Sequence, residues 1–181
     1  MKNFLPLKIR KLAYNSLVRS HVEYGILAYG SCKGKSLKQL CNLLKKSMRI
    51  VCNKKYISHT DPLFGSLEIL KFHDLYNLNV SAFMYQYLHK KLPPSFNNMF
   101  TPLVAAKRTL NYRLERTKTK RLESLPKVVF PRTWNEIDFE TKSSKNIRTF
   151  KQKIFVEAIT KYNSFKCRRD NCQSCICDAT L

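Results

Sequence analysis

Four cysteines near the C-terminus have the spacing that most directly suggests chemistry. They form a C-x4-C-x2-C-x-C pattern made of Cys167, Cys172, Cys175 and Cys177. Four thiolates can bind one zinc ion tetrahedrally, and a C-x2-C pair is a common half of such a site. The cluster has neither a histidine nor a glycine turn, so a reduced free-thiol tail is the alternative to zinc. No other feature of the sequence requires a cofactor.

The rest of the sequence contains no pattern of a self-contained active site. A polymerase or nuclease needs clustered carboxylates to hold divalent metals. Here the 12 Asp and Glu are scattered, without an Asp-Asp or Asp-x-Asp pair. Gly-rich phosphate loops, His-Glu-x-x-His and Gly-x-Ser-x-Gly are also absent. We therefore expect the chain alone to have no catalytic activity.

The strongest signal is positive charge. The 181 residues include 34 Lys and Arg, which gives a formal charge of +22 and a sequence pI of about 9.9. Residues 1–60 and 107–163 carry almost all of the excess, and residues 61–106 are neutral overall. Such a balance favours a nucleic-acid partner. A lysine-rich surface without a partner is the alternative, and a membrane surface is a weaker one.

The sequence predicts an intracellular protein, either nuclear or cytoplasmic. It has no apolar run of 18 or more residues, so no transmembrane helix is expected. Lys8, Arg10 and Lys11 interrupt the N-terminal segment where a signal peptide needs an unbroken apolar stretch.

A clear helical period begins at Leu37. Its apolar positions are Leu37, Leu40, Cys41, Leu44, Met48, Val51 and Cys52. Lys38, Lys45, Lys46 and Arg49 fall together on one flank of this helix, with no acid between residues 33 and 55. We interpret the flank as a phosphate-binding ridge, with a solvated charged face as the alternative. The further predicted contacts are Lys8, Lys11, Lys54, Lys55, Lys107, Arg108, Arg113 and Arg116.

Three other long helices are expected, and Thr60-Asp61-Pro62 is a start signal for a short one before the second of them. The first covers about residues 6–29 and has Ile9, Leu12, Ala13 and Leu17 on its inward stripe. The second, at residues 72–90, is apolar all round and therefore predicted to be the buried core helix. The last runs from about residue 146 to 162, and its inward residues are Ile147, Phe150, Ile154, Phe155, Ala158, Ile159 and Tyr162. Cys32, Cys41 and Cys52 are expected to be small core residues.

A small β-hairpin is expected between the core helix and the last one. Leu110, Tyr112 and Leu114 alternate with polar residues, which is the period of a half-buried strand. Residues 128–130 are its predicted partner, limited to an edge by Pro131. We expect Trp134 to be buried where the hairpin meets the last helix. The prediction is thus a mainly α protein divided into residues 1–106, 107–163 and a Cys-rich tail, 164–181.

An ordered set of short motifs resembles a known family. The motifs include FLP at 4–6, LAYNSL at 12–17, HVEYGILAYG at 21–30, HTDPLF at 59–64, FMY at 83–85, LP at 92–93 and WN at 134–135. Together they are similar to the region after the palm in jockey-like non-LTR retrotransposon reverse transcriptases, over about residues 3–163. The match departs at Ile137-Asp138, where such relatives carry Leu-Pro.

The resemblance implies a helical thumb-like bundle that holds a template–primer duplex by its backbone. In the family, which is an RNA-directed DNA polymerase of mobile elements, the catalytic Asp-Asp box lies upstream, so no catalytic residue is assigned here. The implied partners are RNA, DNA or an RNA–DNA hybrid, and a palm from a separate polypeptide. Because such elements copy themselves from the 3′ end, a non-functional relic is an alternative. A structural or interaction protein with no nucleic-acid role is another.

Overall fold

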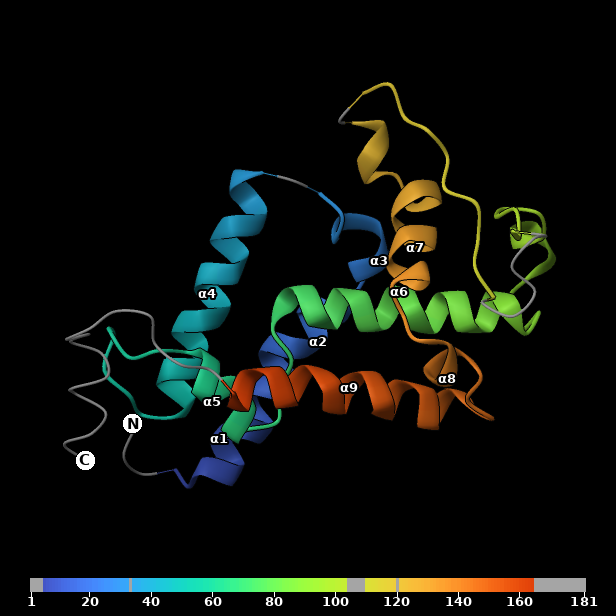
Figure 1. Ribbon diagram of the computed structural model, residues 1–181. Helices are drawn as coiled ribbons and strands as arrows, with labels where there is room; N and C mark the ends of the chain where they lie inside the picture. The colour runs from blue at the N-terminus through green and yellow to red at the C-terminus, as the bar shows by residue number, and fades with distance from the viewer. Residues whose placement is uncertain (1–4, 33, 104–109, 120, 165–181) are drawn as a thin grey trace. The chain divides into compact units, whose positions relative to one another are not determined.

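The computed structural model describes residues 5–32, 34–103, 110–119 and 121–164, and most of them are helical (Figure 1). The helices are α1 (Leu7–Tyr14), η1 (Asn15–Arg19), α2 (Ser20–Glu23), α3 (Ile26–Tyr29), α4 (Lys35–Val51), α5 (Asp61–Ser66), α6 (Phe72–Leu88), η2 (Pro94–Phe96), η4 (Leu122–Ser124), α7 (Pro126–Asn135), α8 (Phe139–Lys142) and α9 (Ile147–Asn163). The predicted mainly α class is therefore confirmed. No helix within the described residues is long and apolar enough to cross a membrane.

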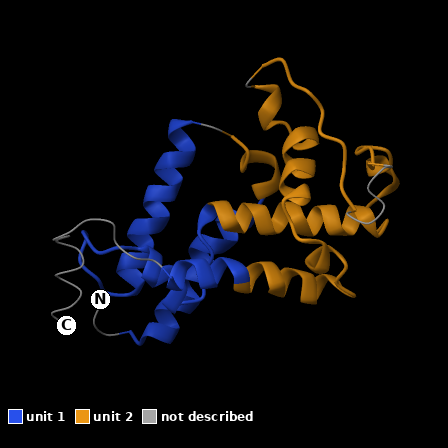
Figure 2. Cartoon of the chain, in the orientation of Figure 1, with its two compact units in different colours: residues 1–24, 34–72, 157–181 blue, residues 25–33, 73–156 orange. Residues whose placement is uncertain are grey.

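The chain forms two compact units, and each is made of separate segments (Figure 2). Unit 1 contains residues 1–24, 34–72 and 157–181, and unit 2 contains residues 25–33 and 73–156. The division into 1–106, 107–163 and 164–181 stays a prediction.

The N-terminal helix of unit 1 exposes the stripe that was predicted to face inward. Leu12 and Leu17 are 63% and 69% exposed, and Ile9 and Ala13 are exposed as well. Instead, Tyr14 and Val22 are buried. A π-helical turn, η1, lies within this segment and changes the spacing of the side chains along it. The predicted inward orientation of the stripe is therefore wrong: Ile9, Leu12 and Ala13 are exposed within α1 itself, before the π turn, and Leu17 is exposed within that turn. The single helix predicted over residues 6–29 is also interrupted, since Tyr24 is extended and Gly25 has a left-handed φ of 66°.

Polar contacts around Lys71 bring the end of α9 onto α5 within unit 1. The Lys71 ammonium pairs with Asp61 at 2.7 Å and lies 4.3 Å from the ring centroid of Tyr162. The Lys71 backbone N–H donates to the Tyr162 hydroxyl at 3.2 Å. Residues 91 positions apart in the chain thus close this unit.

Helix α6 is the core helix that the sequence predicts. Leu75, Tyr76, Val80, Met84 and Tyr85 are buried along it. In unit 2, Gly30 at the end of α3 lies so close to Tyr76 that a β-carbon would collide with the ring. A side chain at residue 30 would therefore push α3 away from α6.

The predicted β-hairpin is wrong at its second strand. Residues 128–130 lie in helix α7, which starts with Pro126 in its first turn. Val128, Phe130 and Trp134 are buried along this helix, and Phe130 and Trp134 lie one turn apart on the same side of it. Among the described residues, the β pairing is limited to an isolated antiparallel bridge between Pro102 and Tyr112.

Side chains from α7 and α8 hold the segment at 110–112 in place of a partner strand. The Trp134 indole N–H donates to the Leu110 carbonyl at 2.8 Å. The Asn135 amide accepts from the Tyr112 N–H at 3.0 Å and donates to the Tyr112 carbonyl at 2.8 Å. The buried Lys142 ammonium donates to the Asn111 amide oxygen at 2.8 Å. These hydrogen bonds satisfy the backbone around Tyr112, which has an alternating sequence but no partner strand among the described residues.

The last helix is confirmed with bounds shifted by one residue. The Asn146 side chain caps α9 by accepting from the Thr149 N–H at 2.8 Å. Its predicted inward residues are all buried or half-buried. Trp134 is fully buried, and its ring centroid lies 5.8 Å from that of Phe150 on α9, as expected for this joint.

Candidate nucleic-acid interface

Helix α4 separates an apolar face from a cationic one. Leu44, Met48 and Val51 are buried, as the periodicity predicts. The opposite flank carries Lys38, Lys45 and Lys46, all exposed. Lys35, which begins the helix, falls on the same flank at 100° per residue. We call these four residues and Arg49 the α4 ridge. At 1.5 Å per residue it extends along about 21 Å of helix.

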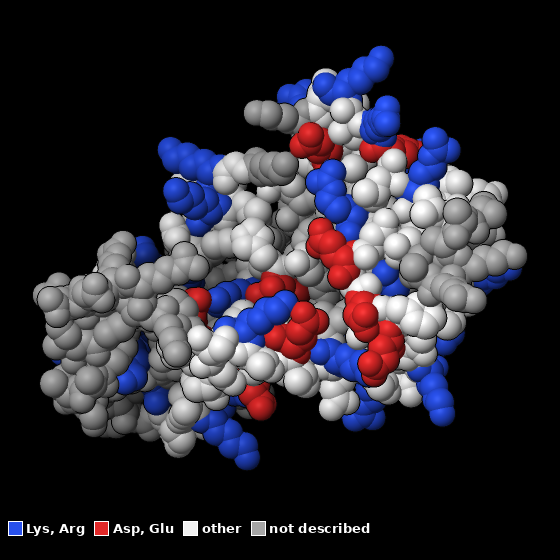
Figure 3. Space-filling model, in the orientation of Figure 1, with Lys and Arg blue, Asp and Glu red and all other residues white. Residues whose placement is uncertain are grey.

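The lysines of the α4 ridge have no carboxylate partner among the described residues. The acids nearest in sequence, Glu23 and Asp61, are engaged elsewhere in unit 1. Glu23 pairs with Arg19 at 2.9 Å, and Asp61 pairs with Lys71. In Figure 3 the cations at the N-terminal end of α4 have no acidic side chain beside them on the visible face. The ridge therefore keeps its charge available to an external anion.

Arg49 differs from the other ridge residues because it is held by the fold. It is half-buried, and its Nε donates to the Ser58 carbonyl at 2.9 Å. Its guanidinium carbon lies 5.6 Å from the ring centroid of Tyr56, and the Lys46 ammonium lies 6.0 Å from the same centroid. Arg49 thus fixes the loop after α4, and two cations of the ridge lie against an exposed aromatic ring.

The cysteines on α4 are less reactive than ordinary thiols. Burial raises the pKa of Cys41 and of Cys52, although neighbouring Lys45 lowers the first and Arg10 and Lys54 lower the second in part. Both are half-buried, in keeping with their predicted place on the apolar side. Cys32 is exposed, so its predicted core position is wrong.

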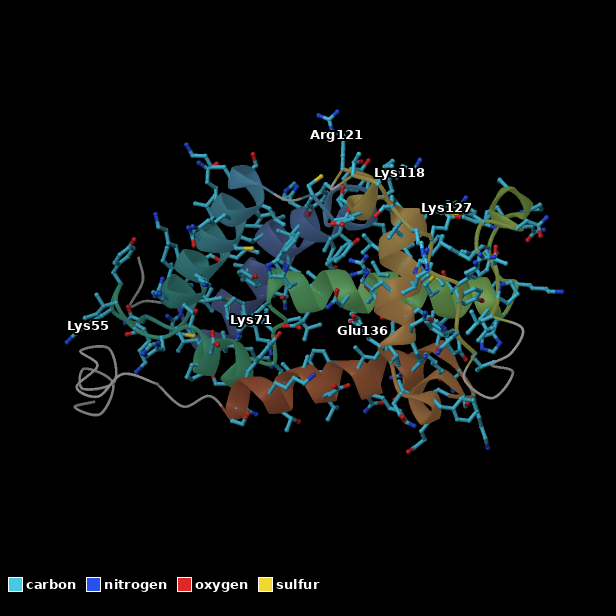
Figure 4. All side chains as sticks on the ribbon, turned by 45° about the horizontal axis from the view of Figure 1, so that its top comes forward. Lys55, Lys71, Lys118, Arg121, Lys127 and Glu136 are labelled. Carbon is cyan, nitrogen blue, oxygen red and sulfur yellow. The ribbon has the colours of Figure 1, made fainter. Side chains whose placement is uncertain are left out.

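The other predicted contacts of unit 1 lie on α1 and on the loop after α4. Lys8 is exposed and Lys11 is half-buried on α1, which contacts α4. Lys54 is half-buried, whereas Lys55 is exposed and points away from the ribbon in Figure 4. Of these four, Lys8 and Lys55 are the ones placed to touch a ligand without rearrangement.

Unit 2 brings two predicted arginines to a pocket of about 840 Å³. Arg113 and Arg116 line it together with Met99, Phe100, Thr101, Leu114, Glu115 and Lys127. The Lys127 ammonium pairs with Glu115 at 2.9 Å. Over α7, α8 and α9, blue and red side chains lie close together in Figure 3. The cations of this unit are therefore partly neutralised by neighbouring acids.

Six predicted site residues belong to segments that the structure does not describe. Lys107 and Arg108 lie outside the described residues, as do Cys167, Cys172, Cys175 and Cys177. Within the described ranges no three His, Cys, Asp or Glu side chains come together as a metal site would require. Zinc binding by the tail remains a prediction.

Three residues of these surfaces, Lys35, Tyr56 and Lys127, were not predicted from the sequence, although Lys35 fits the helical period of the α4 ridge. Tyr56 directly follows Lys54 and Lys55, and an aromatic residue beside paired lysines is a detectable signal for nucleic-acid binding. Lys127 gave no comparable signal, because only the fold brings it to Arg113 and Glu115.

No family model, curated protein or solved structure matches the chain.

Proposed function

We propose that the chain is the thumb and following region of a non-LTR retrotransposon reverse transcriptase, and that it binds template–primer nucleic acid through backbone phosphates. The single observation that supports this most is the α4 ridge, where exposed Lys38, Lys45 and Lys46 have no carboxylate partner among the described residues. A lysine ammonium is a point charge that suits phosphates, and phosphate contacts carry no sequence information directly.

The expected mechanism is electrostatic. Each phosphate contact releases condensed counterions, so affinity falls steeply with salt. Non-specific dissociation constants of this kind are roughly 10⁻⁴ to 10⁻⁶ M at physiological salt. Because the sequence has no paired aspartates, we expect the chain alone to give no product in a primer-extension assay. Extension by the chain alone would contradict the proposal.

A palm from a separate polypeptide is the second proposed partner. Its proposed contact surface is the exposed apolar stripe of α1 and η1, which includes Ile9, Leu12 and Leu17. Contiguous exposed apolar residues are typical of surfaces that contact another protein. Mixing the chain with a palm fragment of the family tests this, and replacing Leu12 and Leu17 by Gln should weaken the association.

The test of nucleic-acid binding uses charge reversal on α4. Combining Lys38→Glu, Lys45→Glu and Lys46→Glu should remove most duplex affinity. It should also lower the slope of log K against log salt by about 0.9 for each phosphate that the variant no longer neutralises. Arg49 is left unchanged, since it holds the loop through Ser58.

A matched control carries the same charge change elsewhere. Lys145→Glu, Arg148→Glu and Lys151→Glu alter three exposed cations at the start of α9. This variant should keep most of the affinity. Equal losses of affinity in both triple variants would mean that net charge alone binds the duplex, and would remove the ridge from the proposal.

The relic alternative is favoured by the same exposed stripe on α1 and η1. A thumb without its palm would expose this apolar surface and self-associate. Sedimentation of the purified chain distinguishes the two hypotheses: aggregation supports a relic, and a soluble monomer that binds duplex supports the proposal.

A further inference from the structure

The loop after α4 presents an aromatic side chain to solvent. Tyr56 is 71% exposed, and Ile57 beside it is exposed as well. The loop itself is held firmly: the Lys54 N–H donates to the Arg49 carbonyl at 2.9 Å, and Ser58 is buried and accepts from Arg49. A large aromatic side chain thus projects from a backbone that is fixed against the end of α4.

Two cations of the α4 ridge lie against this ring. Arg49 and Lys46 are within about 6 Å of the ring centroid, the range of a cation–π contact. The ring remains largely exposed despite these contacts. Positive charge and an accessible aromatic surface therefore occur at the same point.

We propose that Tyr56 is a stacking platform for an unpaired base, with Lys46 and Arg49 holding the adjoining phosphate. The ligand is single-stranded nucleic acid, such as the unpaired template next to a duplex. Proteins that bind single strands combine aromatic rings, on which bases stack, with a cationic track for the backbone. The inference rests on the proposed function, and adds an unpaired strand to the duplex held by the α4 ridge.

The surroundings favour a nucleic acid over an acidic protein surface. The ridge continues from Tyr56 along α4 through Lys45 and Lys38, so a chain of phosphates finds successive cations. A base offers an apolar face to Tyr56 and a charged phosphate to Lys46 within one nucleotide. RNA and DNA share this chemistry, and oligonucleotides of the same sequence in both forms distinguish the two sources.

The experiment compares wild type with Tyr56→Leu, which keeps an apolar side chain but cannot stack. The probes are a single-stranded oligonucleotide carrying a fluorescent adenine analogue quenched by stacking, a blunt duplex, and heparin. Heparin is a polyanion without bases. We expect Tyr56→Leu to weaken single-strand binding about tenfold and to abolish quenching, with duplex and heparin binding unchanged. Tyr56→Phe and Tyr56→Trp should retain both affinity and quenching.

Two outcomes overturn the inference while leaving the proposed function standing. In the first, Tyr56→Leu binds and quenches the single strand as wild type does. In the second, it weakens duplex and heparin binding as much as single-strand binding. Circular dichroism of each variant checks that the fold is kept. If wild type binds neither the duplex nor the single strand, the proposed function and the inference both fail.

Discussion

Each unit contains lysine or arginine against an aromatic ring, but the contacts at Tyr56 in unit 1 and at Trp134 in unit 2 are buried to very different extents. In unit 1, Lys46 and Arg49 lie against the exposed ring of Tyr56. In unit 2, the Lys142 ammonium lies 5.8 Å from the centroid of Trp134, and both residues are buried. The contact at Tyr56 is therefore open to solvent, whereas the contact at Trp134 is part of the packed interior.

The difference has a physical basis in how each cation is satisfied. Lys142 donates to Asn111 and to the Asn135 carbonyl, so the fold supplies its hydrogen-bond partners. Lys46 has no hydrogen bond or ion pair to another described residue, and it remains solvated. A buried cation without acceptors would cost much free energy, whereas an exposed one costs little. Only the exposed cation can exchange water for a phosphate.

The largest expected effect is on folding stability, and it distinguishes Trp134 from Tyr56. Trp134→Ala should lower the free energy of unfolding by about 3–5 kcal/mol, because it leaves a cavity and removes the donor to Leu110. Tyr56→Ala should change it by less than about 0.5 kcal/mol, since the side chain is exposed. Urea unfolding followed by circular dichroism measures both. A similar loss of stability in the two variants would contradict the contrast between these residues.

The next effect concerns the interior of unit 2 at high pH. Burial raises the pKa of Tyr112 to about 12 from its ordinary 10.0. The folded protein thus favours the protonated phenol. The contribution of Tyr112 to the free energy of unfolding is complete below pH 10 and is lost as the pH rises towards 12. A pKa difference of this size corresponds to about 2–3 kcal/mol.

The variant Tyr112→Phe isolates this contribution. Burial lowers the pKa of Lys142, with Asp138 opposing in part, so Lys142 gives a stability change of opposite sign as the pH rises. Burial also raises the pKa of Tyr14 and Tyr76. Wild type and variant share these groups, so their effects largely cancel in the difference in stability between the two proteins. As the pH rises from 10 towards 12, wild type should lose stability relative to the variant; a difference in unfolding midpoint that stays constant over this range would show that the pKa of Tyr112 is the same in the folded and the unfolded chain.

The smallest effect compares single charges in the two units. Lys45→Glu should raise the free energy of unfolding by about 0.2–0.5 kcal/mol, because the new carboxylate precedes Arg49 by one helical turn. Glu115→Lys should lower it by up to about 1 kcal/mol, because it breaks the pair with Lys127 and places two cations side by side. Thermal melts measure both changes. Only Lys45→Glu should also weaken duplex binding, and a destabilising Lys45→Glu would contradict the view that ridge lysines serve a ligand.

Helical periodicity was enough to predict the long helices. For α4 and α9 the apolar residues recur with a helical period, and α6 is apolar all round; each of the three helices appears within a few residues of its predicted bounds. The cationic flank of α4 followed from the same pattern, because a helix that buries Leu44 and Met48 must expose Lys45 and Lys46.

Two predictions failed because a local pattern has more than one solution. Residues 128–130 are β-branched and aromatic, yet Pro126 starts a helix whose buried side includes Trp134. On the N-terminal helix, the buried side contains Tyr14, so Leu12 is exposed before the π turn at Asn15–Arg19 and Leu17 is exposed within it. The apolar period of a sequence does not show where a π turn inserts an extra residue into a helix. It also does not show which face of a helix a neighbouring segment will cover.

The sequence by itself determined the helical class, the position of the main helices and the charge on one flank of α4. These depend on residue types a few positions apart, whose spacing along a helix is fixed by its geometry. Tertiary structure decided that Arg49 reaches Ser58, that Tyr56 lies against two cations, and that Asn135 holds the backbone of Tyr112. Such contacts depend on where loops and distant segments meet, which is set by packing and burial.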